Sequence, residues 1–234
     1  MEIRINNPLH LLWLFLLVTG CTNEKDPQSE MEFHFTFENG NENWQSFFSD
    51  YPVGEEDFYE LEFSNTVLPS PLNQNTRSLK VSGNNHSDDL FSGIFRKFEN
   101  LQPNKSYSVL FDIDLASNAL IGGVGIGGDP NLSLGAGGIN NLPRNTIDDL
   151  HHYRPNFISK IQSGESNEVF KIIGKIGVSE TYPPPYMMIN RSNTGDPFTI
   201  TTNEKGEFWL MIATDSGFEG ITTLYYTSIK IVID

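Results

Sequence analysis

Cysteine is nearly absent from this sequence: one in 234 residues. A disulfide framework needs at least two cysteines and a multi-thiolate zinc site needs several, so both are excluded. Basic residues are also scarce, because 15 Lys and Arg stand against 30 Asp and Glu and give a formal net charge of −15. A chain this acidic repels phosphate backbones, and no nucleic-acid partner is therefore expected.

The first apolar run is too short to span a bilayer as a mature helix. It covers Leu11 to Val18, whereas a spanning helix needs about 20 residues. The run ends in Val18-Thr19-Gly20-Cys21, which resembles the bacterial lipobox. This resemblance predicts a lipoprotein signal peptide over residues 1–20 and lipidation of Cys21, including a palmitate chain. An ordinary signal peptide followed by a chance cysteine is the alternative.

The predicted anchor sets the expected location of the chain. Several acyl chains on Cys21 are enough for stable attachment to a lipid bilayer. Residues 21–31 are predicted to form a flexible tether, since Thr22 to Glu30 contain no apolar side chain except Pro27. Thr22 differs from the aspartate that marks inner-membrane retention, so the outer membrane is expected. Its periplasmic face and its surface face both remain open as sites of attachment.

Helical periodicity is almost absent, and alternation typical of strands replaces it. From Tyr107 to Leu115 the odd positions are apolar, as in a strand with one buried face. Strands are predicted at 33–37, 58–63, 78–83, 90–99, 107–115, 170–178, 198–201, 208–213 and 224–233. The only short helix is predicted from Asn145 to Tyr153. The fold class is therefore all-β, an antiparallel β-sandwich forming one domain over residues 32–234.

Glycine is concentrated in one stretch, Gly122 to Gly138, which we interpret as a long insertion in the sandwich. Gly123, Gly125 and Gly128 match the G-x-G-x-x-G pattern of dinucleotide-binding proteins. That pattern needs a helix directly after it, and Asp129-Pro130 follows instead. Glycines in a strand context indicate bulges or close packing of another segment.

Several short motifs together resemble the jelly-roll carbohydrate-binding modules with a galactose-binding-like fold. These motifs are Phe35-Thr36-Phe37-Glu38-Asn39-Gly40 with Trp44, Ser78 to Gly83, Leu101 to Tyr107 and Leu224 to Ile229. The resemblance implies a jelly-roll domain that binds a glycan without catalysis. The family usually has an Asp pair near a structural calcium, where this chain has Thr227-Ser228. The whole mature chain also resembles a group of uncharacterised bacterial lipoproteins, through Asn84 to Phe91 and Thr214 to Gly220.

Three aromatic residues are candidates for stacking on a sugar ring: Trp44, Tyr182 and Tyr186. The two tyrosines flank the run Pro183-Pro184-Pro185, which predicts an exposed, extended segment. Trp209, in contrast, lies inside an apolar run and is predicted to belong to the core.

One loop offers possible metal ligands. His86, Asp88 and Asp89 supply an imidazole and two carboxylates, which could hold calcium or zinc, although no cofactor is expected. The alternative is a self-bonded turn, because Asn, Ser and Asp side chains bond their own backbone.

The leading hypothesis is a membrane-anchored, non-catalytic binding module for a glycan or another extracellular polymer. The alternative is a structural or adhesion component of a cell-envelope assembly. A hydrolase is the third hypothesis. Asp215-Ser216-Gly217 matches the aspartic-protease triplet, but that chemistry needs two such carboxylates and the chain has one copy.

Overall fold

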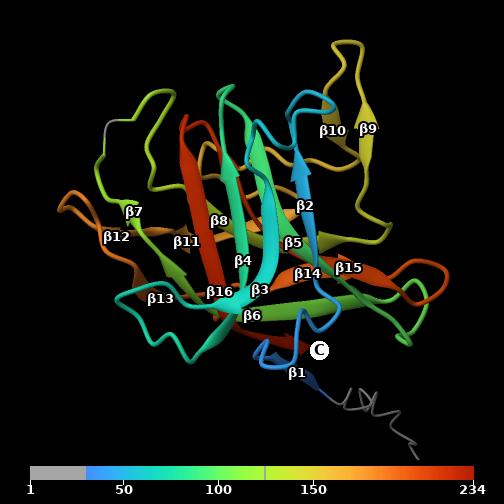
Figure 1. Cartoon of the computed structure of the whole chain (residues 1–234). Helices are drawn as coiled ribbons and strands as arrows, with labels where there is room; N and C mark the ends of the chain where they lie inside the picture. Colours follow the sequence, from blue (N-terminus) through green and yellow to red (C-terminus); the bar gives the residue numbers. More distant parts are fainter. Residues whose placement is uncertain (1–29, 124) are drawn as a thin grey trace, which may run out of the picture.

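The computed structural model describes residues 30–123 and 125–234, which form two packed antiparallel β-sheets (Figure 1). The strands of the larger sheet are β1 (Met31–Phe35), β3 (Glu62–Val67), β4 (Arg77–Asn84), β6 (Ser106–Ser117), β13 (Met187–Ser192), β14 (Phe198–Thr201) and β16 (Ile221–Ile233). Their order is β13-β6-β16-β4-β3, with β1 paired to β16 and β14 paired to β6. The first and last strands of the described chain therefore pair with each other.

The smaller sheet has five strands and lies against the larger one. Its strands are β2 (Gln45–Ser49), β5 (Leu90–Phe98), β8 (Ser133–Ile139), β11 (Phe170–Lys175) and β15 (Phe208–Ser216). Their order is β11-β8-β15-β5-β2. The chain crosses repeatedly between the sheets, for example from β4 to β5 and from β5 to β6. This arrangement confirms the predicted antiparallel jelly-roll β-sandwich.

Two strand pairs lie outside the main sheets. The pair β9 (Asn145–Ile147) and β10 (Tyr153–Pro155) is antiparallel, whereas β7 (Ala119–Leu120) and β12 (Gly177–Ser179) are parallel. Residues 30–123 and 125–234 contain no helix long and apolar enough to cross a membrane. The predicted signal peptide and Cys21 lie outside the described residues.

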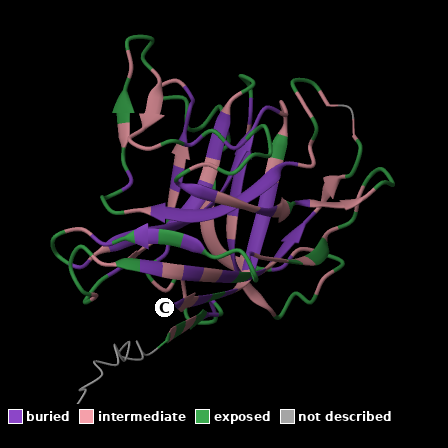
Figure 2. Ribbon diagram, turned by 180° about the vertical axis from the view of Figure 1, so that it is seen from behind, coloured by how far each residue is buried: buried purple, intermediate pink, exposed green. Residues whose placement is uncertain are grey.

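The main core lies between the two sheets and follows the predicted alternation. Val109, Phe111 and Ile113 of β6 are fully buried there, and the alternate residues of β15, such as Leu210, join the same cluster. Figure 2 shows the central strands as largely buried. A side chain at every second position of a strand points to one face, so one pattern builds the whole interface.

The outer face of the smaller sheet is also apolar, which explains why every residue of β15 is buried. Trp209 and Met211 point to this face and form a second cluster. The segment 156–169 covers it through Phe157 and Ile161, and the Phe157 ring lies 5.2 Å from that of Phe47. Trp209 is therefore a core residue, as predicted.

The glycine-rich stretch is only partly an insertion, which corrects the sequence interpretation. Residues 121–123 and 125–132 lie in a loop, but Ser133–Ile139 is strand β8, which pairs with β11 and β15 inside the smaller sheet. A Cβ on Gly137 would lie 1.9 Å from the Val169 carbonyl oxygen. The glycines let another segment approach the strand closely, and they also remove the alternation that would have revealed it.

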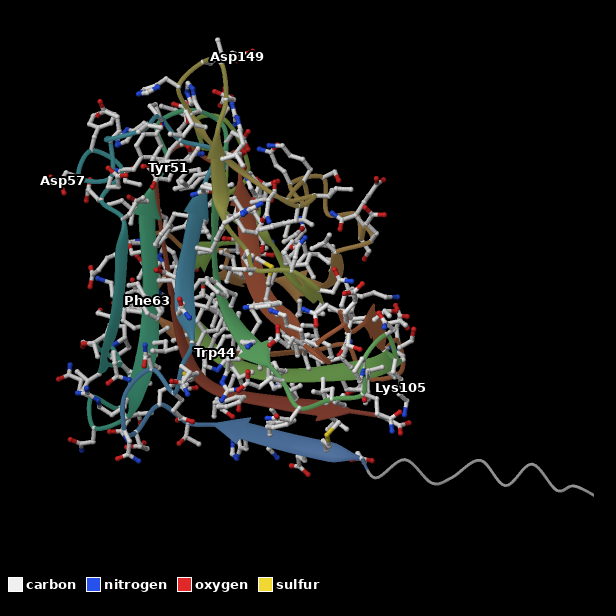
Figure 3. The ribbon with its side chains drawn as sticks, turned by 90° about the vertical axis from the view of Figure 1, so that its right-hand side faces the viewer. Trp44, Tyr51, Asp57, Phe63, Lys105 and Asp149 are labelled. Atoms are coloured by element: carbon white, nitrogen blue, oxygen red, sulfur yellow. The ribbon has the colours of Figure 1, made fainter. Side chains whose placement is uncertain are left out.

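The predicted helix from Asn145 to Tyr153 is wrong, because this segment forms the β9–β10 hairpin. The Asp148 carboxylate accepts hydrogen bonds from the backbone N–H groups of Leu150 and His152, both at 2.9 Å. This side-chain acceptor closes the turn in place of a helical carbonyl. Asp149 lies at the tip of the projecting hairpin (Figure 3).

Candidate ligand-binding site

A pocket of about 390 Å³ opens beside the end of β6. It collects residues from six separate parts of the chain: the end of β6 with β7, the glycine-rich loop, Ile176 between β11 and β12, the proline run, the β15–β16 loop and the start of β16. The side chains that give it its chemical character are Ser117, Asn118, Tyr182, Phe218, Thr222 and Thr223. No single stretch of sequence contains the site.

The glycine-rich loop forms one wall of this pocket by packing closely against its neighbours. A Cβ on Gly125 would lie 2.4 Å from the Phe218 ring, and a Cβ on Gly123 would lie 2.9 Å from Pro130. The backbone N–H of Glu219 donates to the carbonyl of Ile126 at 2.8 Å and ties the loop to the β15–β16 loop. These glycines therefore allow close packing. No helix follows them, so the G-x-G-x-x-G pattern does not form a dinucleotide-binding motif here.

Tyr182 supplies an exposed aromatic ring at the pocket. Its side chain is 81% exposed, although Pro183 and Pro184 beside it also line the pocket. The fixed backbone angle of proline restricts this segment. An aromatic ring held at the mouth of a pocket can stack on the apolar face of a ligand. The prediction that Tyr182 is exposed is thus confirmed; its role in stacking on a sugar stays a prediction.

Among the described residues, the pocket lining carries no charged side chain. The Asn118 amide and the Thr222 hydroxyl make no hydrogen bond within the described residues, so both are free to pair with a ligand. The Thr223 hydroxyl is engaged with Ser82 at 2.7 Å, and the Ser117 hydroxyl accepts from the Ala119 N–H at 3.1 Å. Such a lining suits an uncharged ligand that carries both hydroxyl groups and an apolar face. Sequence reasoning missed Asn118, Phe218 and Thr222, because nothing in their local sequence distinguishes them.

Trp44 was predicted to stack on a sugar ring, and the structure corrects this prediction. Its side chain is fully buried in the main core, where its ring lies edge-on to that of Phe35 at 5.7 Å (Figure 3). A ring with no exposed surface has no face to offer a ligand. Trp44 therefore stabilises the sandwich.

Tyr186 is half-buried and does not line the pocket, although it follows the same proline run as Tyr182. Its ring packs edge-to-face on Tyr225 at 5.4 Å, next to Leu68 and Ala116. Burial raises the pKa of the Tyr186 hydroxyl. The structure thus assigns Tyr186 to packing between β16 and the loop before β13.

The predicted metal ligands point to different partners. His86 stacks on the Phe58 ring at 4.1 Å, and its Nε2 lies 3.0 Å from the Phe58 carbonyl oxygen. Asp89 pairs with the Lys160 ammonium at 2.6 Å, whereas Asp88 lies beside Gly127 of the glycine-rich loop. Within residues 30–123 and 125–234, no group of three His, Cys, Asp or Glu side chains is arranged to hold a metal ion.

A cluster of charged residues lies against segment 156–169, which itself contributes Lys160: Asp50, Asp89, Arg154, Lys160 and Asp215. Arg154 donates to Asp50 at 2.7 Å, while Lys160 binds Asp89. Asp215 Oδ2 accepts hydrogen bonds from the backbone N–H groups at positions 161 and 162, at 3.1 and 3.2 Å. The carboxylate of the protease-like triplet thus anchors the segment that covers the smaller sheet.

Asp215 gives a prediction about pH. Burial raises the pKa of its carboxyl group to about 6, although Lys160 and the Ile161 N–H act in the opposite direction. Between pH 4 and 6 the folded state therefore holds a proton that the unfolded chain has released. The free energy of unfolding must fall as the pH rises through this range, and then level off. The total fall in the free energy of unfolding that is expected from Asp215 is on the order of 3 kcal/mol.

Asp215→Asn should remove this pH-dependent fall in the free energy of unfolding, since an amide does not ionise. Urea denaturation of both proteins at pH 4, 5, 6 and 7 measures the effect. The difference between wild type and variant isolates Asp215 from the other titrating groups. A difference that stays constant from pH 4 to 7 would contradict the raised pKa.

Neither a protein-family model nor a curated protein matches this chain. Solved structures with a similar fold include a carbohydrate-binding module of the β-sandwich superfamily, at a TM-score of 0.39 and 13% identity over 82% of this chain. A mannan-recognising carbohydrate-binding module has a TM-score of 0.37 and 10% identity, covering 88% of this chain and 99% of that one.

A cleaved adhesin domain of Lys-gingipain from Porphyromonas gingivalis has a TM-score of 0.36 and 7% identity, covering 86% of this chain and 97% of the adhesin domain. The chain spans 58% of the length of the first of these structures, the superfamily module. At such identities the similarity concerns the fold alone.

Proposed function

We propose that this protein is a non-catalytic module that binds a neutral glycan in the pocket beside β6. The observation that carries this proposal is an uncharged pocket with the exposed Tyr182 ring at its mouth. A pyranose has an apolar face that suits the ring, and hydroxyl groups that suit the free groups of Asn118 and Thr222. The proposal rests on this pocket, not on the similar folds.

Tyr182→Ala is expected to weaken glycan binding at least about tenfold, because it removes about 1.4 kcal/mol or more of ring contact. The purified full-length chain would first be applied to a glycan array, with and without calcium. Isothermal titration with the best glycan then gives the dissociation constant of each variant.

Two controls accompany this measurement. Tyr182→Phe keeps the ring and should bind almost as wild type. Phe58→Ala removes another exposed aromatic side chain, 57% exposed, that does not line the pocket. Equal affinity of wild type and Tyr182→Ala for the best glycan would overturn the assignment of the pocket.

We also propose that the chain is anchored through acylated Cys21 to the outer membrane, with residues 21–30 as its tether, one residue shorter than predicted because Met31 begins β1. Cys21→Ser removes the sulfur that would carry the lipid, so the variant should incorporate no labelled palmitate and should leave the membrane fraction. Growth with labelled palmitate, followed by fractionation, measures both. Label that still enters Cys21→Ser would overturn the proposed anchor.

One observation favours the second candidate, a structural or adhesion component of the cell envelope. Ile221, which lines the pocket, and Ile126, in the adjacent glycine-rich loop, are 60% and 73% exposed. Exposed apolar side chains gathered at one place are typical of contacts with another protein. This function predicts that the full-length chain binds no glycan on the array.

A further inference from the structure

A second concave surface lies between β14 and the segment that covers the smaller sheet. This groove has a volume of about 640 Å³, larger than the pocket beside β6. Its walls are the end of β8 with the turn after it, residues 155–158 at and beyond the end of β10, residues 168–169, and all four residues of β14. The residues that matter for binding are Asn140, Asn141, Phe157, Ile158, Glu168 and Thr199.

The groove presents polar groups that the fold does not use. Asn140, Asn141 and Thr199 are exposed, and within the described residues their side chains make no hydrogen bond. The amides and the hydroxyl together offer both donors and acceptors. Ile158, 47% exposed, adds an apolar contact, and Glu168 is the only charged residue of the lining.

The groove and the pocket lie near opposite ends of one strand. Thr199 of the groove pairs with Ser108 in β6, whereas Ser117 of the same strand lines the pocket. Nine residue steps along a strand, at about 3.3 Å each, separate the two positions by about 30 Å. Figure 1 shows β7 and β12, next to the pocket, on the left and β14 toward the right.

We infer that the groove is a second contact site for the same neutral polysaccharide chain, which spans both surfaces at once. This inference rests on the proposed function, since it takes the pocket as the first site. A chain held at one site is present at a high effective concentration at the other. The protein therefore binds long chains more tightly than short oligosaccharides, which are too short to reach from one site to the other.

Two kinds of groove variant test this inference in the full-length chain. Thr199→Arg fills the groove from an exposed strand position, and Asn140→Ala with Asn141→Ala removes the free amides. Thr36→Arg places the same side chain on another exposed threonine that lines neither surface. The probes are mannan, xylan and a mixed-linkage glucan, each with its own disaccharide, measured by affinity electrophoresis and titration.

Both groove variants should lose at least about tenfold in affinity for the long polysaccharide and keep wild-type affinity for the disaccharide. Thr36→Arg should bind both as wild type. Unchanged polysaccharide binding in both groove variants overturns the groove and leaves the pocket in place. Loss in the groove variants with none in Tyr182→Ala overturns the pocket, and with it the inference that one chain spans two sites; glycan contact is then assigned to the groove alone. If wild type binds none of these probes and no neutral glycan on the array, both proposals are wrong.

Discussion

Replacing Phe111 with alanine is expected to lower the free energy of unfolding by about 3–5 kcal/mol. Phe111 is fully buried in β6, the strand that pairs with β13, β14 and β16 of the larger sheet. The truncation loses the transfer free energy of the ring and leaves a cavity between two sheets that can close over it only partly. Urea denaturation followed by tryptophan fluorescence measures the loss.

Asp112→Ala is the matched control, one residue further along the same strand. Asp112 is exposed, and its carboxylate accepts a hydrogen bond of 2.6 Å from the Asn190 amide. Loss of this surface contact should cost about 1 kcal/mol or less. Equal losses at the two positions would contradict the inward and outward faces assigned to β6.

The sequence predicts strands well where one face is buried and the other is exposed. β6 and β14 are such strands, and their predicted ranges agree with the structure within two residues. β13 was missed, because this edge strand has no buried residue and so shows no alternation. The strand predicted at 58–63 is wrong over most of its length, because the chain turns there and Glu60 has a φ of 49°. Strand β3 begins only at Glu62.

The candidate site is harder to predict than the fold. Tyr182 could be identified because the adjacent prolines indicate an exposed segment. Asn118, Phe218 and Thr222 come together only through the pairing of strands far apart in the chain. The role of Asp215 was likewise hidden, since its partners at positions 161 and 162 are backbone N–H groups. Backbone donors leave no signature in side-chain chemistry.

Gly137→Ala is expected to destabilise the protein by about 3 kcal/mol, the upper end of the usual cost of overpacking and close to the loss of a buried ring. Gly137 lies in β8, opposite Phe170 of β11 on one side and Met211 of β15 on the other. The added methyl carbon would lie 1.9 Å from the Val169 carbonyl oxygen and 3.0 Å from the Phe170 Cα. Both are backbone atoms, so no rotamer change relieves the overlap and a strand has to move.

Gly128→Ala provides the comparison for this prediction. Its Cβ would meet no atom closer than 3.3 Å, and it lies in the loop before β8. This variant should lose about 1 kcal/mol or less. Thermal and urea denaturation of both variants give the comparison, with circular dichroism to show that each keeps its sheets. If Gly137→Ala is as stable as Gly128→Ala, then the Val169 backbone does not pack on β8. The glycines of that strand would in that case need another explanation than close approach.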